Sequence, residues 1–396
     1  MSLQIEPAEN LYPFVLRKDQ EQLREKIRDF AAREIAPNVM AWDEACEFPL
    51  AVVKKLSTMG LLGATVPPEY GGAGLGYVSY MMAIEELSAV DGSLGITIAA
   101  HNSLGTNHIF LAGSEAQKRR YISRLASGEW LAAWALTEPG AGSDAGGVRT
   151  TAVKKSDRFV LNGNKIFTTN GSYADITVVI AVTDSKKGTH GLSAFLVEKG
   201  TAGLQIKKMI NKLGLRASDT SELIFENCEI PAENLLGAEG EGFIDALRVL
   251  DGGRISIAAL ALGIGRGALD AALKRVRERR QFGKAIAEFQ GIQWKLAEMA
   301  TRLDAARLLT QRAAVLKDAG RRVTLESSMA KLFSSEAAVR ICDEAVQLFG
   351  GYGFIKDYPA EKYYRDVKLC TIGEGTSEIQ RTVIAREIFK NGASES

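Results

Sequence analysis

A single carboxylate near the C-terminus lies between two glycines, in the segment Gly373-Glu374-Gly375. Flanking glycines remove side-chain bulk and permit unusual backbone angles, so a substrate can approach the carboxylate closely. The nearest basic residues along the chain are Lys368 and Arg381. If Glu374 is desolvated, its pKa rises and it can act as a general base. A solvated loop glutamate is the alternative, and for this residue taken alone it is the better interpretation.

Two further segments are rich in small residues. Trp134–Gly147 contains the run Thr-Glu-Pro-Gly-Ala-Gly-Ser-Asp, and such a loop can direct several backbone N–H groups at a phosphate or a bulky polar ligand. A surface turn is equally consistent with that composition. The second segment, Gln347–Phe354, contains Gly350 and Gly351, which a helix C-cap followed by a turn would also explain.

The composition of the 396-residue chain argues against several classes of function. The formal net charge is +1, so no general attraction to nucleic acid or to an anionic membrane is expected. The four cysteines form no CxxC pair and the three histidines are scattered, so we predict no metal site. We expect His101 and His108 to be packed or hydrogen-bonded. No signal-peptide pattern and no apolar run of membrane-spanning length is evident, which predicts a cytoplasmic location without membrane insertion.

The spacing of apolar residues divides the chain into three segments. Helical spacing dominates residues 1–130, short β-branched and aromatic runs dominate 131–241, and long helical patterns return over 242–396. We therefore predict an α+β, mostly α fold with an N-terminal helical domain, a central antiparallel β domain and a C-terminal four-helix bundle.

Individual elements follow from the same patterns. The predicted helices include Met81–Ala100, Asn107–Leu125, Phe243–Arg280, Phe289–Ala319, Thr324–Leu348 and Ser377–Phe389. The predicted strands are Thr150–Val153, Phe159–Leu161, Lys165–Thr169, Ile176–Val182, Leu192–Val197 and Leu223–Phe225, with Asn162-Gly163 as a turn. Gly263-Ile264-Gly265 lacks the spacing and the preceding strand of a dinucleotide fingerprint, so close helix packing explains it better.

The chain resembles the acyl-CoA dehydrogenase family over nearly its full length. Ala135–Gly147 fits one family signature, Gln347–Asp366 fits a second, and the segment around Glu374 follows in the expected order. The resemblance is nearest the short-chain, butyryl-CoA dehydrogenase-like branch. It implies FAD-dependent α,β-dehydrogenation of an acyl-CoA thioester to the trans-2-enoyl-CoA, as in fatty acid β-oxidation. It also implies that electrons pass to an electron-transfer flavoprotein.

The resemblance implies an FAD held between the β domain and the C-terminal bundle. The residues implied to line the flavin are Trp134, Leu136, Thr137, Gly142, Ser143, Phe167 and Thr169. Those implied to contact the FAD of a neighbouring subunit are Arg279, Phe282, Gln290, Gln347, Gly350 and Gly351. Thr376 and Ser377 would touch the cofactor near the base. Because FAD is then shared across an interface, the resemblance implies a homotetramer built as a dimer of dimers.

The resemblance also assigns roles around the substrate. Glu374 removes the α-proton while the β-hydrogen leaves as hydride to the flavin, and the thioester carbonyl is hydrogen-bonded by the Glu374 N–H. The residues implied to bind the acyl-CoA are Ser143, Phe243, Asp251, Arg254 and Gly375. Asp251 and Arg254 could equally form a structural ion pair.

Two glycines bear on the choice of base and on the substrate. Other family branches place the base at the position of Gly253, and many relatives carry Tyr, Phe or Leu at the position of Gly373. We hypothesise that Gly373 widens the pocket and admits branched, cyclic or bulkier acyl groups. One alternative is a flavin acyl-CoA oxidase that uses oxygen, although such chains are usually longer. Another is a non-catalytic relative acting as a binding or assembly protein, which the presence of Glu374 argues against.

Overall fold

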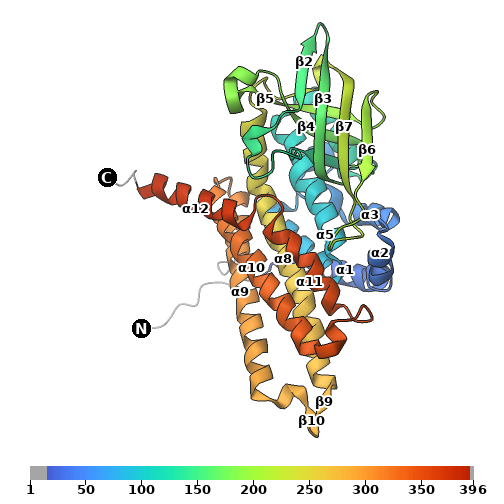
Figure 1. The fold of residues 1–396 in the computed structure, drawn as a ribbon, viewed down its shortest axis with the longest axis vertical. Helices are drawn as coiled ribbons and strands as arrows, with labels where there is room; N and C mark the ends of the chain where they lie inside the picture. The colour runs from blue at the N-terminus through green and yellow to red at the C-terminus, as the bar shows by residue number, and fades with distance from the viewer. Residues whose placement is uncertain (1–15, 393–396) are drawn as a thin grey trace.

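Helices precede and follow a central β-sheet (Figure 1). The structure is a computed structural model that describes residues 16–392. The helices before the sheet are α1 Lys18–Phe30, α2 Val39–Ala45, α3 Leu50–Leu56, α4 Gly76–Val90, α5 Gly92–Ala99, α6 Asn107–Ala112 and α7 Glu115–Ala126. Those after it are α8 Gly242–Glu278, α9 Gln290–Asp318, α10 Thr324–Phe349, α11 Ala360–Val367 and α12 Ser377–Gly392. The predicted fold class is therefore confirmed.

The sheet is mostly antiparallel, as predicted. Its strands are β1 Ala132–Ala135, β2 Thr151–Lys155, β3 Arg158–Thr169, β4 Ile176–Val182, β5 Leu192–Glu198, β6 Leu204–Lys208, β7 Thr220–Pro231 and β8 Leu235–Leu236. The strand order is β6-β7-β3-β2-β4-β5-β8, and β1 pairs with β4 in parallel. The β2–β4 pairing is also parallel. A separate short hairpin, β9 Arg280–Gln281 with β10 Lys284–Ala285, joins α8 to α9.

The prediction of a turn at Asn162-Gly163 is wrong. These residues lie inside β3, which replaces the two predicted strands Phe159–Leu161 and Lys165–Thr169. The register against β7 shifts between Leu161 and Gly163, so this is a bulge in a continuous strand. Gly163 has a φ of +146°, and an ideal Cβ there would lie 2.5 Å from the Thr150 hydroxyl. Glycine therefore marks a close backbone approach at this point.

Two predicted helices are each divided in the structure. Asp91 has extended backbone angles and ends α4, and its side chain accepts a hydrogen bond from Ser93 N to cap α5. Ser114 and Gln117 form a capping box that starts α7 after the short α6. In both places a polar residue with an N-cap side chain interrupts an otherwise continuous helical pattern.

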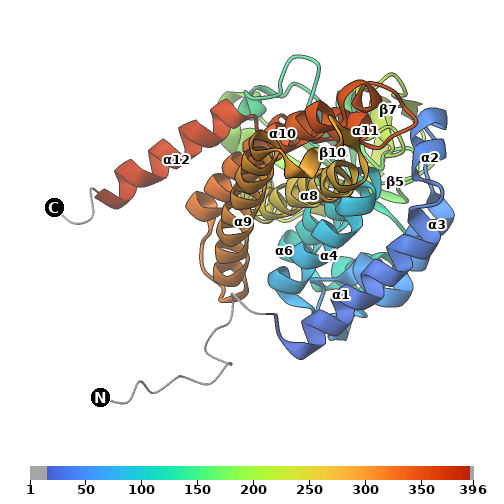
Figure 2. The same ribbon diagram turned by 90° about the horizontal axis from the view of Figure 1, so that it is seen from below.

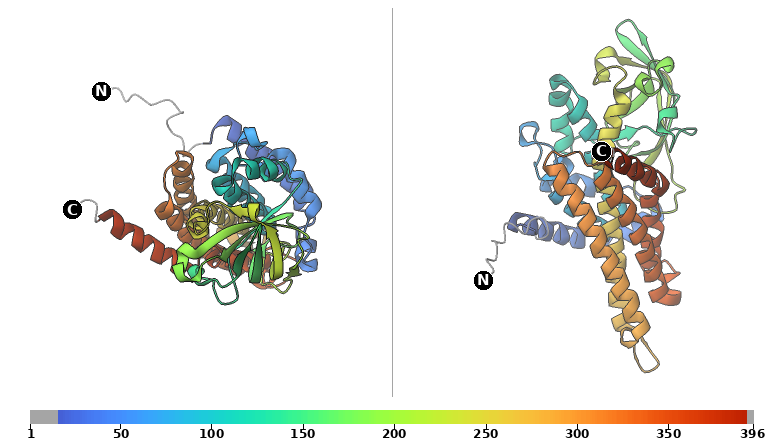
Figure 3. Two further views of the ribbon diagram at one scale, coloured as in Figure 1. Left: turned by 90° about the horizontal axis from the view of Figure 1, so that it is seen from above. Right: turned by 90° about the vertical axis from the view of Figure 1, so that its left-hand side faces the viewer.

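The helices before and after the sheet share one apolar core. Leu87 of α4, Leu260 and Ile264 of α8, and Ile341 of α10 belong to the same buried cluster. Helices α8, α9 and α10 pack against one another, and the short α11 packs against α8 and α10 (Figures 1 and 3). The fourth helix of the predicted bundle, Ser377–Phe389, lies in α12, which contacts α10 but projects from the bundle (Figure 2). A rigid frame thus connects the sheet to the C-terminal segment that carries Glu374.

Helix α8 corrects one expectation. Among residues 16–392 it is the one helix long and apolar enough to cross a membrane, and 83% of its most apolar window is buried inside the protein. The expectation that no apolar run reaches membrane-spanning length is therefore wrong, and burial accounts for the run. The glycines of α8 do serve close packing, as predicted, because an ideal Cβ on Gly263 would lie 2.4 Å from the Glu85 carbonyl of α4.

Two parts of the chain extend away from the main body. The β9–β10 hairpin lies at the end of the helical bundle that is farthest from the sheet. Helix α12 projects sideways from the bundle (Figures 1 and 2). Both carry exposed aromatic rings, since Phe282 is 93% exposed and Phe389 is 78% exposed. Such exposure of large apolar side chains is typical of an interaction surface.

Candidate active site

Glu374 lies in the loop between the short 3₁₀ segment Lys368–Thr371 and α12. Its φ of +55° is in the left-handed region, which is uncommon for a residue with a side chain. The residue as a whole is half-buried, but its Oε2 atom is buried and has no hydrogen-bond partner among the described residues. Burial raises the pKa of Glu374 to about 7, and the nearby cations of Lys331 and Arg254 oppose the rise. These are the properties of a general base working near neutral pH.

Space for the Glu374 carboxylate depends on a glycine of α8. An ideal Cβ on Gly253 would lie 2.0 Å from Glu374 Oε2 and 3.0 Å from a methyl group of Leu104. Leu104 belongs to a π-helical turn, Ala100–Thr106, that follows α5. The carboxylate therefore occupies the volume that a side chain at position 253 would need.

Asp251 and Arg254, on either side of Gly253 in α8, form an ion pair. Arg254 Nη1 donates to Asp251 Oδ1 at 2.8 Å, and Asp251 Oδ2 accepts from the Thr324 hydroxyl at 2.7 Å. Arg254 is only 5% exposed, and burial lowers its pKa. Asp251 and Arg254 thus form the structural ion pair that was the alternative to a role in binding CoA. Their role in holding CoA remains a prediction.

The loop predicted to line a flavin is braced by a buried ion pair that the sequence analysis did not identify. Glu138 accepts hydrogen bonds from Arg149 N at 2.7 Å, Thr150 N at 2.9 Å and Lys165 Nζ at 2.7 Å. Lys165 also donates to Leu136 O at 2.9 Å and is fully buried. Burial lowers the pKa of Lys165 to about 8. The signal for this pair in the sequence is weak, because Lys165 follows the polar run Asn162-Gly163-Asn164 in β3.

The same loop offers an open surface next to an exposed aromatic ring. Gly142 and Ser143 are exposed, and nothing lies within 4 Å of an ideal Cβ on Gly142. Phe167, on β3, is 60% exposed and has a φ of +56°. Thr169, two residues further along β3, is half-buried. An open glycine loop beside an exposed ring and hydroxyl groups fits a planar aromatic cofactor with a polar edge, so these residues fit FAD.

Other residues predicted to line the flavin are more buried. Trp134 of β1 is half-buried, and its indole Nε1 donates to His108 Nδ1 at 2.9 Å. Leu136 belongs to the apolar cluster against which Trp134 packs. Phe243 of α8, which was predicted to bind the acyl-CoA, also packs against this cluster as a partly buried neighbour. The backbone carbonyl of Thr137 accepts from Ile166 N at 2.8 Å and ties the loop to β3.

The histidines have the hydrogen-bonded roles that were predicted. His101 Nδ1 accepts from Ala132 N at 3.0 Å, and its Nε2 lies 2.9 Å from Leu62 O. Burial lowers the pKa of His101 and of His108 to about 4, so both rings are neutral at physiological pH.

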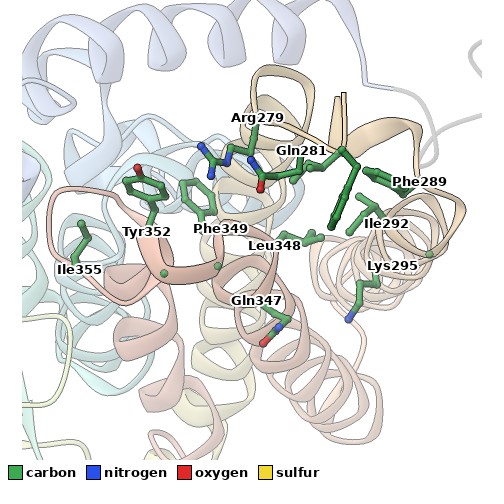
Figure 4. Close-up of a pocket in the computed structure, with 15 residues that line it drawn as sticks. Arg279, Gln281, Phe289, Ile292, Lys295, Gln347, Leu348, Phe349, Tyr352 and Ile355 are labelled. Carbon is green, nitrogen blue, oxygen red and sulfur yellow. The ribbon is translucent and has the colours of Figure 1, made fainter. Parts of the chain in front are cut away.

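A second set of predicted cofactor residues lies in a separate cavity of about 790 Å³ (Figure 4). The predicted residues that line it are Arg279, Phe282, Gln347, Gly350 and Gly351. The Arg279 guanidinium lies 5.7 Å from the ring centre of Tyr352. Gly350 also forms the predicted C-cap of α10, with a φ of +61°. Gln290 is exposed at the start of α9, next to lining residues but not itself among them.

The two sets are not joined within one chain. The cavity lies between the hairpin, α9 and the end of α10, whereas the flavin-lining loop belongs to the sheet domain at the other end of the bundle (Figures 1 and 4). Another cavity, of about 520 Å³, is lined by Thr376 and Ser377 together with Ile372 and Arg340. Thr376 and Ser377 are close to Glu374 in the chain.

Comparison with known proteins places the chain in a family. Sequence models of the acyl-CoA dehydrogenase N-terminal, middle and C-terminal domains match residues 17–129, 133–228 and 240–389. The short-chain-specific acyl-CoA dehydrogenase of Clostridium acetobutylicum is 48% identical, over 95% of this chain and 100% of that protein.

Two solved structures are similar throughout. Butyryl-CoA dehydrogenase from Megasphaera elsdenii is 42% identical with a TM-score of 0.93, covering 95% of this chain and 99% of that one. A chain from a structure described as an electron transferring flavoprotein of Acidaminococcus fermentans is 47% identical with a TM-score of 0.93, covering the same shares. The chain therefore belongs to the acyl-CoA dehydrogenase family and is an FAD-dependent oxidoreductase that acts on acyl-CoA.

Proposed function

We propose that the protein dehydrogenates a short-chain acyl-CoA between its α and β carbons, with Glu374 as the base. The buried, unpartnered Oε2 of Glu374 is the observation that carries this proposal. The similarity to a short-chain-specific enzyme and to a butyryl-CoA dehydrogenase supports the size of the acyl group.

Each of these site residues would have its own role in the reaction. The Glu374 carboxylate accepts the α-proton, and its pKa of about 7 narrows the mismatch with that weakly acidic proton. The Glu374 N–H would donate to the thioester carbonyl, where negative charge develops, and a well-placed donor of this kind contributes about 3 kcal/mol. When bound, FAD supplies the acceptor for the hydride that leaves the β carbon. Arg254, next to the base, would hold the polar part of the substrate.

The cofactor would be held by residues from two domains and two subunits. Thr137, Gly142, Ser143, Phe167 and Thr169 offer hydroxyls, backbone N–H groups and an aromatic face toward a flavin. The 790 Å³ cavity around Arg279 and Gly350 would receive part of the FAD of a neighbouring subunit. This division supports a homotetramer assembled as a dimer of dimers. We retain 1–130, 131–241 and 242–396 as the domain division.

Gly373 would enlarge the acyl pocket beside the base. An ideal Cβ there would meet Leu369 at an ordinary contact distance of 3.6 Å, so the position can hold a side chain. Its backbone does not require glycine, because its φ is outside the left-handed region. The missing side chain therefore leaves room for a branched or cyclic acyl group.

The base is tested with Glu374→Gln. The purified variant should remain yellow and bind acyl-CoA, yet butyryl-CoA should no longer bleach its flavin absorbance under anaerobic conditions. In the unaltered protein, kcat/KM should rise as the pH passes through about 7, because only the ionised carboxyl accepts a proton. Bleaching retained by the variant would remove Glu374 from this role.

Electron-transfer flavoprotein is the proposed electron acceptor. The family resemblance and the similarity to the Acidaminococcus fermentans chain support it. Turnover with butyryl-CoA should reduce that flavoprotein, and oxygen consumption should stay low. Rapid oxygen uptake would instead favour the oxidase alternative.

A further inference from the structure

The loop that carries Glu374 has two consecutive residues with positive φ. Glu374 has a φ of +55° and Gly375 a φ of +96°. A residue with a side chain persists in this region only where surrounding groups hold it there. Groups outside the loop must therefore stabilise this conformation.

Two buried side chains from different helices hold the carbonyl groups of these two residues. Lys331 of α10 donates from Nζ to Gly375 O at 2.6 Å. Gln380, in the first turn of α12, donates from Nε2 to Gly375 O at 3.0 Å and to Glu374 O at 3.1 Å. Lys331 and Gln380 are both 0% exposed. An ideal Cβ on Gly375 would lie 2.6 Å from Gln380 Nε2, so the amide lies directly against the backbone.

The charge of Lys331 has an electrostatic effect on Glu374 that a neutral hydrogen-bond donor would not have. Burying an ammonium is costly, and burial lowers the pKa of Lys331 to about 8, whereas the nearby Cys370 and Glu374 raise it. Gln380 holds the Glu374 carbonyl with a neutral amide, so a hydrogen bond to this backbone does not by itself require a charged donor. A buried ammonium near a carboxyl group favours the ionised form of that group. The cations that act on Glu374 are Lys331 of α10 and Arg254 of α8, and Tyr80 of α4 is the titratable group facing it from the N-terminal helices.

We propose that Lys331 and Gln380 are positioning residues for the proton transfer at Glu374. Both fix the backbone of the loop, and the buried Lys331 ammonium, bonded to the residue next to Glu374, in addition favours the carboxylate form of the base. This inference rests on the proposed function of Glu374.

Three substitutions separate the two effects. Lys331→Met removes the hydrogen bond and the charge, Lys331→Arg keeps the charge, and Gln380→Met removes hydrogen bonds alone. Lys212→Met is the control, because Lys212 is a half-buried lysine that likewise donates to two backbone carbonyls, Leu215 O and Ser218 O, in a loop of the β domain. Each variant is purified with its flavin and compared for flavin content, thermal unfolding, and kcat/KM for butyryl-CoA against pH.

The expected results differ among the variants. Lys331→Met should lose about tenfold to a hundredfold in kcat at pH 7, because a small displacement of a catalytic group is costly. In the pH profile of kcat/KM, the acidic limb of Lys331→Met should move to higher pH. The acidic limb of Lys331→Arg should lie close to that of the unaltered protein. Gln380→Met should lower kcat without moving the limb, and Lys212→Met should change stability alone.

Specific outcomes would overturn the inference. An acidic limb that stays in place in Lys331→Met, with a loss of stability like that of Lys212→Met, would assign Lys331 a purely structural role. If Glu374→Gln keeps its turnover, the proposed function itself fails. An inactive Glu374→Gln together with an unmoved limb would refute this inference and leave the proposed function standing.

Discussion

At the scale of single residues, the two glycines near the proposed base, Gly253 and Gly373, differ in what a side chain at each position would contact. Gly253 leaves room for the carboxylate, because a Cβ there would lie 2.0 Å from Glu374 Oε2 and would force that side chain to move. A carboxylate base at position 253 and one at position 374 would therefore compete for the same volume. Gly373 is not required by the backbone, and its missing side chain leaves space that a substrate can use.

The Gly373 hypothesis predicts a change in substrate preference. Gly373→Tyr should reduce kcat/KM for isobutyryl-CoA or a cyclic acyl-CoA by about tenfold to a hundredfold relative to butyryl-CoA, the scale of steric discrimination in a pocket. The measurement is kcat/KM across a panel of straight, branched and cyclic acyl-CoAs. Gly373→Ala serves as a control, because its Cβ makes ordinary contacts with Leu369. An unchanged profile in the tyrosine variant would refute the hypothesis.

At the scale of elements, the glycine-rich loop depends on a lysine of the neighbouring strand. Lys165 of β3 links Leu136 O to the Glu138 carboxylate, and Glu138 in turn accepts from Arg149 N and Thr150 N. Lys165 is 0% exposed and Glu138 is 7% exposed. Water cannot replace either partner easily, so the pair fixes the shape of the loop that is predicted to line the flavin.

Breaking the Lys165–Glu138 pair should lower the free energy of unfolding. Lys165→Met leaves the Glu138 carboxylate buried without its cation, which typically costs about 3–5 kcal/mol. We expect a lower free energy of unfolding and weaker flavin retention, measured by denaturant titration and by the absorbance of bound flavin. Lys165→Met combined with Glu138→Gln should recover part of the stability, because the unpaired charge is gone. A loss below about 1 kcal/mol in the single variant would contradict this account.

At the scale of the whole molecule, two of the most exposed aromatic residues lie where the chain extends from its core. The hairpin between α8 and α9 carries Phe282, and the projecting α12 carries Phe389 (Figures 1 and 2). The cavity beside the hairpin is lined by residues predicted to serve the cofactor of another subunit. Assembly would therefore bury these surfaces and complete the cofactor site together.

The homotetramer predicts coupled loss of assembly and cofactor. Phe282→Ser should weaken subunit association and lower flavin content, because it removes an aromatic ring that is 93% exposed in the single chain. Sedimentation velocity and the ratio of flavin to protein absorbance measure both effects. Val153→Ser, on β2 at the other end of the molecule, is the control, since Val153 is also exposed. Full assembly and flavin content in Phe282→Ser would contradict the proposed interface.

The sequence by itself was enough for the family and for the order of helices and sheet, and it led to the prediction of Glu374 as the base. Motifs and hydrophobic periodicity are local, so Trp134–Gly147, Gln347–Asp366 and the long helices were predicted from short stretches of chain. Local patterns failed at Asp91, Ser114 and Gly163, where capping or a strand bulge changes the element without changing its hydrophobicity.

Only the tertiary structure decided how Glu374 is surrounded. Its burial, the space left by Gly253 and the ammonium of Lys331 come from segments far apart in the chain, with 44 positions separating Lys331 from Gly375. The pKa of a carboxyl group depends on its desolvation and on charges near it in space. Neither quantity is encoded in the residues next to it in sequence, so the structure was needed to distinguish a buried carboxyl group from a solvated one.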